Sequence, residues 1–143
     1  MENSWANIVK TNNSNKVLVN DKCKLKEKVA VNKTCGGFRL SQIAKEKIFD
    51  LKKKIDFNIE ENILRNDPDL INVIMDLGEE KASGDVYGVK MKIKVLSFDF
   101  DPETEFFIIY KNQGLEDVIV RSNINNIAYI INDDGSRTKL QSK

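Results

Sequence analysis

Apolar residues recur at helical spacing in the first half of the chain and alternate with polar residues in much of the second half. Residues 42–55 carry apolar side chains three or four positions apart, which predicts an amphipathic helix. A second helix is predicted over residues 67–83, because Asp67 can cap it and Pro68 suits the first helical position. Gly78 lies inside this pattern and either permits close packing or ends the regular helix early.

Strands are predicted where strict alternation or short apolar runs occur. Residues 89–95 alternate between apolar side chains and lysines, which is typical of a strand with one face on the core and one in water. Residues 106–110 are a continuous apolar run, so this strand is expected to be covered on both faces, by a helix and by a second subunit. Further short strands are expected over residues 16–20, 28–33, 117–121 and 127–131, and residues 57–60 permit a strand or an extended connection.

These elements predict one α+β domain over residues 1–143, with two helices packed on one face of a mainly antiparallel sheet of four to six strands. Residues 1–15 are expected to be a flexible or docked extension, residues 16–132 the core, and residues 133–143 a frayed tail. With 143 residues, 41% of them hydrophobic, the chain can build a core that needs no metal or disulfide.

A glycine turn joins the predicted strand over residues 28–33 to the first helix. Its two adjacent glycines allow positive φ, so peptide N–H groups can turn toward a bound atom or a close neighbour. Ser41 stands at the N-cap position, and Arg39 adds a full charge to the partly positive helix start. A phosphate or carboxylate would fit there, although the glycines can also serve sterics alone. The candidate ligand-binding residues are Asn32, Cys35, Gly36, Gly37, Arg39 and Ser41.

Few residues of this chain suit catalysis or metal binding. Histidine is absent, and the two cysteines, Cys23 and Cys35, do not have metal-ligand spacing. A Cys35 nucleophile activated by the helix start and Arg39 is an alternative, but no histidine can serve as its base. We therefore expect no enzyme, no catalytic residue, no metal and no cofactor.

The net charge of +1 hides an asymmetry between the halves of the chain. Residues 1–66 carry 14 basic and 8 acidic side chains, and residues 67–143 carry 9 and 14. The halves can neutralise each other inside the fold or across a homo-oligomer interface. A nearly neutral total argues against nucleic-acid binding, and the lack of a long apolar run predicts no membrane partner and a cytoplasmic protein.

The motif Asn-Lys-x-Cys-Gly-Gly-Phe-x-Leu-Ser over residues 32–41 resembles the opening of a family of small, uncharacterised bacteriophage proteins, Asn-(Arg/Lys)-Cys-Tyr-Gly-Gly-Phe-Gly-Leu-Ser. Thr34 and Cys35 replace the Cys-Tyr of that motif. Residues 65–70 and 76–80 are similar to its Arg-x-Asp-Pro-x-Leu segment and its Glu-Leu-Gly-Glu-like helix end, whereas residues 120–124 lack the histidine and tryptophan of its last motif. The resemblance covers residues 29–124 and implies a phage or prophage origin.

A phage origin implies an accessory viral protein that acts against a host defence in the host cytoplasm. Our first hypothesis is a non-catalytic binding protein that captures a small anionic ligand, such as a nucleotide signal, at the glycine turn. The second is a protein–protein inhibitor of a host defence complex, similar in role to an anti-CRISPR protein. An enzyme that uses Cys35 is the third.

Overall fold

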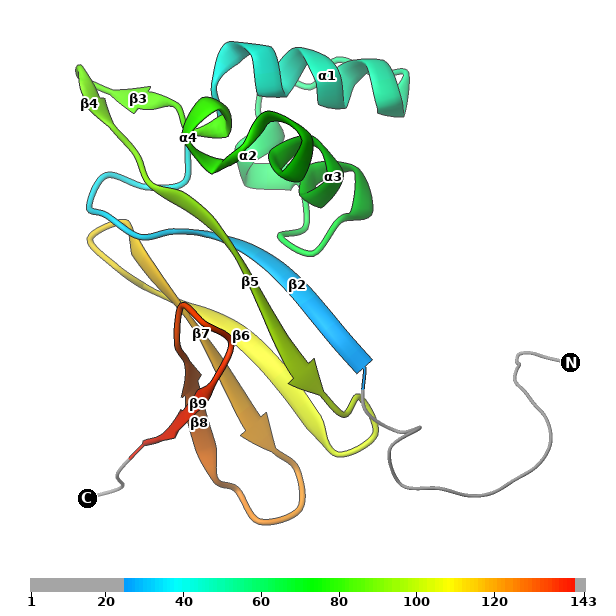
Figure 1. Ribbon diagram of the computed structural model, residues 1–143, viewed down its shortest axis with the longest axis vertical. Helices are drawn as coiled ribbons and strands as arrows, with labels where there is room; N and C mark the ends of the chain where they lie inside the picture. Colours follow the sequence, from blue (N-terminus) through cyan, green and yellow to red (C-terminus); the bar gives the residue numbers. More distant parts are fainter. Residues whose placement is uncertain (1–24, 141–143) are drawn as a thin grey trace, which may run out of the picture.

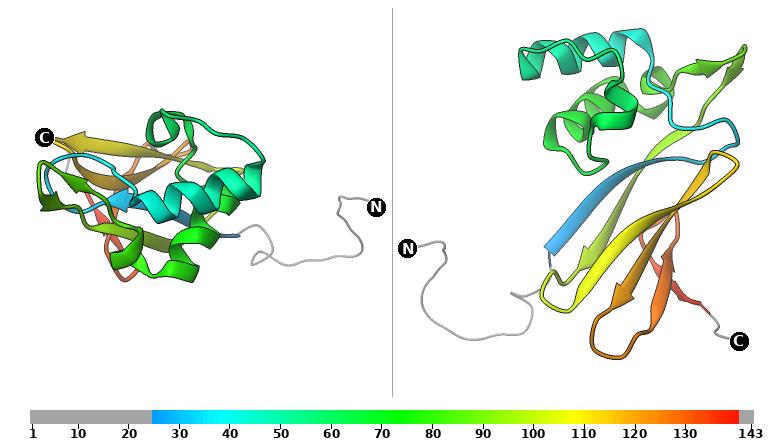
Figure 2. Two further views of the ribbon diagram at one scale, coloured as in Figure 1. Left: turned by 90° about the horizontal axis from the view of Figure 1, so that it is seen from above. Right: turned by 180° about the vertical axis from the view of Figure 1, so that it is seen from behind.

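Three layers make up residues 25–140, the part of the chain that the computed structural model describes: helices, a two-stranded ribbon and a four-stranded sheet (Figures 1 and 2). The predicted α+β class is confirmed. The predicted strand at residues 16–20, Cys23 and the N-terminal extension lie outside the described residues. The helices are α1 (Gln42–Lys52), α2 (Ile59–Asn62), α3 (Pro68–Leu77) and α4 (Glu79–Ala82). The strands are β2 (Leu25–Asn32), β3 (Asp85–Val86), β4 (Val89–Lys90), β5 (Ile93–Phe100), β6 (Glu105–Asn112), β7 (Leu115–Ser122), β8 (Ala128–Ile131) and β9 (Arg137–Lys139).

Both long helices begin at the predicted caps and end earlier than expected. The Ser41 hydroxyl accepts the Ala44 N–H of α1, and α1 stops before Lys53, whose backbone is left-handed with φ of 58°. Helix α3 ends at Leu77 and is capped by Gly78, where φ is 91°, and the chain restarts as the single turn α4. Gly78 therefore ends the regular helix early, which was one of its two expected roles, and the continuous helix to residue 83 was wrong. Residues 57–60 are not a strand, because the one-turn helix α2 begins at Ile59.

The ribbon of β2 and β5 is the middle layer and is covered on both faces. The two strands are antiparallel, from Leu25 opposite Phe100 to Asn32 opposite Ile93. One face packs on the helices through Ala30 and Ile93. The other face packs on the four-stranded sheet through a second cluster that contains Val29, Val31, Leu96, Phe98, Phe100, Val118, Val120 and Ile131. The helices therefore cover the ribbon, and not the larger sheet as the sequence suggested (Figure 1).

The predicted strand over residues 89–95 is split by a change of partner. Val89 and Lys90 form β4 and pair with β3, whereas β5 begins only at Ile93 and pairs with β2. Val89 is 58% exposed, so the apolar side of the alternation is not buried along its whole length. A pattern of alternating residues gives the direction of side chains but not the strand that they pair with.

The four-stranded sheet has the order β6-β7-β8-β9, with every pair antiparallel. Its inner face includes Phe107, whose ring meets those of Phe98 and Phe100 edge to face at 6.1 and 5.5 Å between centroids. On the outer face Phe106, Ile108 and Tyr110 are 43, 48 and 53% exposed. The expectation that a helix covers one side of the run was wrong, because ribbon side chains cover its inner face and no described helix covers its outer face.

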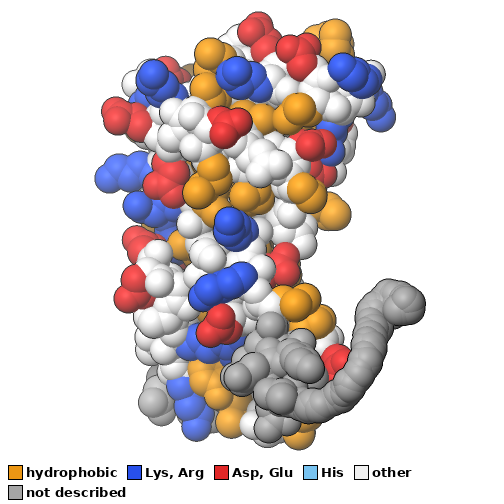
Figure 3. Space-filling model, turned by 45° about the vertical axis from the view of Figure 1, so that its right-hand side comes forward, with side chains coloured by type: hydrophobic (Ala, Val, Ile, Leu, Met, Phe, Trp, Pro, Cys, Tyr) orange, Lys and Arg blue, Asp and Glu red, His pale blue; other side chains and the backbone are white. Residues whose placement is uncertain are grey.

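Opposite charges from the two halves of the chain pair inside the fold. Among the described residues, the pairs that join the halves are Lys26–Asp99, Lys33–Asp117, Lys33–Asp133, Lys52–Asp67, Lys52–Asp69 and Arg65–Glu116. On the face shown in Figure 3, basic and acidic side chains are interspersed with exposed hydrophobic ones. Internal compensation thus accounts for part of the charge asymmetry of the sequence.

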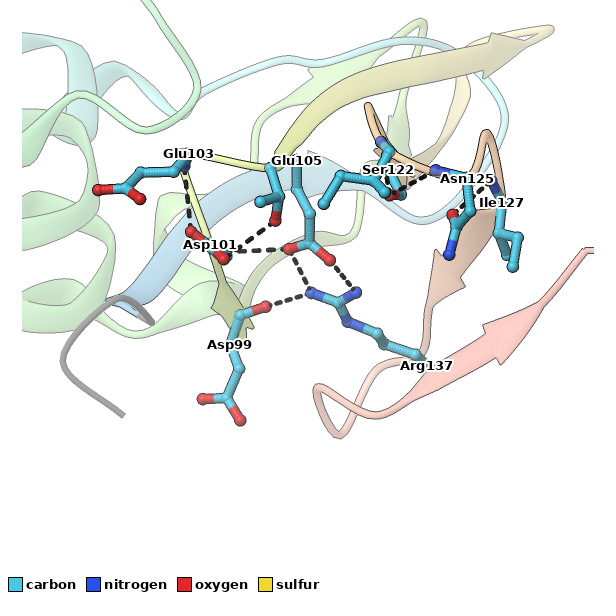
Figure 4. A network of polar contacts seen from close by, with 10 residues as sticks. Asp99, Asp101, Glu103, Glu105, Ser122, Asn125, Ile127 and Arg137 are labelled. Atoms are coloured by element: carbon cyan, nitrogen blue, oxygen red, sulfur yellow. Dashed lines mark hydrogen bonds and ion pairs between the residues drawn. The ribbon is translucent and has the colours of Figure 1, made fainter. Parts of the chain in front are cut away.

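The expected frayed tail contains β9, and Arg137 of β9 forms hydrogen bonds to β6 and β5. Its guanidinium donates to both carboxylate oxygens of Glu105, at 2.8 and 3.0 Å, and to the backbone oxygen of Asp99 at 2.7 Å (Figure 4). A bidentate arginine–carboxylate contact fixes both position and orientation. Low apolar content therefore did not prevent residues 137–139 from pairing with β8.

Asp67 caps α3 and also joins it to α1. Its carboxylate accepts from the N–H groups of Asp69 and Leu70, at 2.8 and 3.3 Å, and lies 2.8 Å from the Lys52 ammonium. Burial opposes its ionisation, but the hydrogen bonds from Lys52, Leu70 and Asp69 outweigh burial and hold the pKa of Asp67 below its ordinary value. Such a group stabilises the fold above its unfolded pKa, and that stability is lost as pH falls through the folded value.

We expect Asp67→Ala to lower the free energy of unfolding by about 1 kcal/mol at neutral pH, because the helix cap is lost. The difference from the wild type should shrink in acid, because the stabilisation is lost as pH falls from the unfolded pKa of Asp67 through its lower folded pKa. Urea unfolding at a series of pH values measures both effects. Asp76→Ala is the control, since exposed Asp76 makes no ion pair or side-chain hydrogen bond within residues 25–140, and an equal loss there would contradict the capping account.

Candidate functional site

The glycine turn packs directly against the β6–β7 turn (Figure 2). Gly36 and Gly37 have φ of 123° and 102°, and the Gly36 N–H donates to the Gln113 oxygen at 3.2 Å. A Cβ on Gly114 would lie 2.3 Å from the Gly37 nitrogen, and one on Gly36 would lie 2.8 Å from the Met91 sulfur. Positive φ thus accounts for all three glycines, and close approach of other atoms also excludes a larger residue at Gly36 and Gly114.

Asn32 is fully buried and holds the glycine turn to the hairpin. Its side-chain amide nitrogen donates to the oxygens of Thr34 and Gly114, at 2.7 and 3.0 Å. Its amide oxygen accepts the Lys92 N–H at 3.1 Å, and its backbone N–H donates to Glu116 at 2.9 Å. The predicted ligand contact from Asn32 is thus replaced by contacts within the protein.

A buried ion pair that the sequence analysis missed lies beneath the turn. Arg65 donates to both carboxylate oxygens of Glu116, at 2.5 and 2.8 Å, and the Glu116 residue is only 1% exposed. The Arg65 guanidinium also lies 3.8 Å from the centroid of the Phe38 ring. The backbone oxygen of Arg65 accepts the Ala30 N–H at 2.8 Å. The alternation along β7 could have indicated that Glu116 is buried, because its side chain lies on the same face of the strand as buried Val118.

The start of α1 is occupied by groups of the protein itself. The Leu40 N–H donates to the Glu60 carboxylate at 3.1 Å, and the Lys45 ammonium lies 3.3 Å from the same oxygen. The Ser41 hydroxyl accepts from Ala44 and donates to the Lys81 oxygen at 2.7 Å. A carboxylate already beside the helix start weakens the case for a ligand anion at that point, because like charges repel.

A cleft of about 730 Å³ opens beside the glycine turn, between β6 on one side and α2 with the loop after it on the other. We call it the glycine-turn cleft. Its lining residues are Gly36, Gly37, Phe38, Arg39, Glu60, Glu61, Ile63, Leu64, Arg65, Asn66, Phe107, Ile108, Ile109, Lys111, Gly114 and Glu116.

Three of the six predicted site residues line this cleft, namely Gly36, Gly37 and Arg39, whereas Asn32, Cys35 and Ser41 do not. Cys35 is exposed and has a free thiol. Exposed Arg39 and Lys111 make no ion pair or side-chain hydrogen bond within residues 25–140. Lys111 was not predicted, because nothing in a strand sequence reports which distant turn its end will meet.

Comparison of the chain with family models, with curated proteins and with solved structures gives no match. No described helix is long and apolar enough to cross a membrane. Within residues 25–140 no three acidic or cysteine side chains gather into a metal-binding group. The geometry of the cleft is therefore the basis for assigning a function.

We expect Arg65→Met to lower the free energy of unfolding by about 3–5 kcal/mol, because it leaves the Glu116 charge buried without a partner. The double variant Arg65→Met/Glu116→Gln should be more stable than Arg65→Met, since it removes that charge and keeps an oxygen that can accept the Asn32 N–H. Chemical unfolding measures the free energy of unfolding of the wild type, the single variant and the double variant. Arg121→Met, which loses only an exposed hydrogen bond to Asn126, is the control. Equal stability of the single and double variants would contradict a buried charge.

Proposed function

We propose that this protein is a non-catalytic binding protein that takes an anionic group into the glycine-turn cleft. The observation that carries the proposal is the pair of cations on the cleft wall, Arg39 and Lys111, neither of which has an ion-pair partner in the described part of the chain. A guanidinium offers paired N–H donors to a carboxylate or phosphate, and an ammonium adds a second charge.

The acidic side chains of the cleft do not cancel these two cations. Glu116 is already paired with Arg65, and Glu60 is already paired with Lys45. Only Glu61 among the cleft carboxylates has no ion pair with a described residue. An anion entering the cleft would therefore meet more unpaired positive than negative charge, which favours binding.

A small anionic ligand such as a nucleotide is the first ligand class that we propose. The cleft volume of about 730 Å³ falls in the range of small-molecule sites. The resemblance to phage proteins makes capture of a host defence signal in the host cytoplasm the biological setting of this proposal. Such a role needs neither a catalytic base nor a metal.

Inhibition of a host defence complex through protein–protein contact is the second candidate function. The observation that favours it is exposed apolar surface at the cleft, where Leu64 is 71% and Ile108 is 48% exposed. Apolar side chains at the margin of a partly charged cleft are typical of protein interfaces, which combine an apolar centre with a polar rim.

We expect Arg39→Ala and Lys111→Ala each to weaken binding of an anionic ligand by about ten- to a hundredfold, because each removes a charge-assisted contact. Calorimetric titration with mononucleotides and cyclic dinucleotides measures the affinities, and circular dichroism checks the fold. Lys47→Ala is the matched control, since Lys47 is exposed on α1 and unpaired within residues 25–140. Wild-type affinity in Arg39→Ala would contradict the site, and no binding by the wild type would favour the second candidate.

Self-association remains a prediction. It is supported by the exposed apolar side chains on the outer face of β6, namely Phe106, Ile108 and Tyr110. We expect light scattering at micromolar concentration to give twice the chain mass of 16.3 kDa. Tyr110→Lys should shift the population to the monomer, whereas Val89→Lys, which changes an equally exposed side chain on β4, should not. A wild-type protein that shows only the monomer mass would contradict the prediction.

A further inference from the structure

β6 is an edge strand in the part of the chain that the structure describes. It pairs with β7, and Asn112 lies opposite Leu115 across a two-residue turn in which Gln113 and Gly114 have φ of 54° and 88°. Antiparallel pairs alternate between hydrogen-bonded and open positions, starting from the hydrogen-bonded pair that closes such a turn. Phe106, Ile108 and Tyr110 therefore direct their backbone groups to β7, and Phe107, Ile109 and Lys111 direct theirs away from it.

The outward backbone groups of β6 face the glycine-turn cleft. Phe107, Ile109 and Lys111 all line the cleft, and their N–H groups donate to no other described residue. The neighbouring edge strand β2 is different, because its Ala30 N–H donates to Arg65 and its Asn32 N–H donates to Glu116. The β2 edge is thus hydrogen-bonded to other parts of the protein, whereas the β6 edge is open among the described residues.

The open edge lacks three of the usual features that prevent strand addition, and its lysine, Lys111, stands near one end of the strand. β6 is eight residues long, contains no proline, and pairs with β7 without a bulge. Short length, proline and bulges are the common ways in which proteins protect an edge. An unprotected edge that lies inside a cleft is instead suited to an added strand, which gains main-chain hydrogen bonds along its whole length.

We infer that the glycine-turn cleft binds an extended peptide segment of a partner protein, which adds to β6 as a further strand. Alternate apolar side chains of this segment would pack beside Phe107 and Ile109, and an acidic side chain at one end would meet Lys111 and Arg39. The inference rests on the proposed function, since it assigns the anionic group in the same cleft to a peptide. Charge complementarity at the Lys111 end selects an acidic segment over a neutral one.

Two variants of the protein test the edge. Ile109→Pro removes the outward N–H and no β6–β7 hydrogen bond. Ile109→Ala keeps that N–H and removes more of the side chain than proline does, so weaker binding by Ile109→Pro cannot be due to lost side-chain volume. The probe is the peptide acetyl-Val-Thr-Val-Thr-Val-Asp-Glu amide, titrated into the full chain by isothermal titration calorimetry. We expect Ile109→Pro to weaken binding by tenfold or more relative to Ile109→Ala, with both proteins folded by circular dichroism.

Chemical changes in the probe test the same contacts without altering the protein. N-methylation of alternate amides gives two peptides, of which one loses the N–H groups that face β6 and the other loses those that face away. We expect tenfold or greater weakening for only one of the two. Replacing both acids by amides should also weaken binding, and Lys47→Ala should leave all affinities unchanged.

The outcomes separate this inference from the proposed function and from other occupants. Equal affinity of the two N-methylated peptides, or no binding up to about 1 mM, overturns strand addition. If one N-methylated peptide alone fails while Arg39→Ala, Lys111→Ala and the amide probe bind as the wild type does, strand addition stands and anion recognition fails. If Leu18→Pro bound the probe tenfold more tightly than the wild type, residues 16–20 of the same or a second copy of this chain would be the occupant of the β6 edge. That result would overturn the inference that a partner peptide binds there.

Discussion

The ion pair between Arg65 and Glu116 is the contact on which the arrangement of the cleft depends. Glu116 belongs to the larger sheet, Arg65 belongs to the loop between α2 and α3, and the carboxylate also accepts the N–H of Asn32 on the ribbon. Each layer of the fold thus contributes one group to a single buried site. Because a buried charge without a partner is very unfavourable, the three layers have to keep this relative position.

The cleft exists because two layers pack on one narrow ribbon. Ala30 and Ile93 on one face belong to the helical core, and Val31 and Leu96 on the other face belong to the core of the sheet. At the β2 edge of this ribbon, the Ala30 N–H donates to Arg65 of the α2–α3 loop and the Asn32 N–H donates to Glu116 of the sheet. The space between the helices and the sheet there is the glycine-turn cleft, and the ion pair lies in its wall.

Local signals in the sequence predicted the starts of elements better than their ends or their partners. Ser41 and Asp67 mark helix starts because a cap is a contact between residues two or three positions apart. The sequence could not show that the outer face of residues 106–110 is exposed. An apolar run has the same sequence pattern whether one face of the strand or both faces are buried. The position of Lys111 in the same cleft as Arg39 depends on the packing of the hairpin on the glycine turn, which no local pattern reports.

The structure separates the roles of the glycines and of the cations in the predicted site. Gly36 and Gly37 are explained by positive φ, by the close approach of Gly114 and by the neighbouring Met91 sulfur, so their presence does not require a ligand. The same packing gives no reason for Arg39, which is exposed and has no ion-pair partner among the described residues. A turn kept only for its shape would accept any polar residue at that position. The features that indicate a function are therefore the charges beside the turn and the open edge of β6, and not the glycine pair.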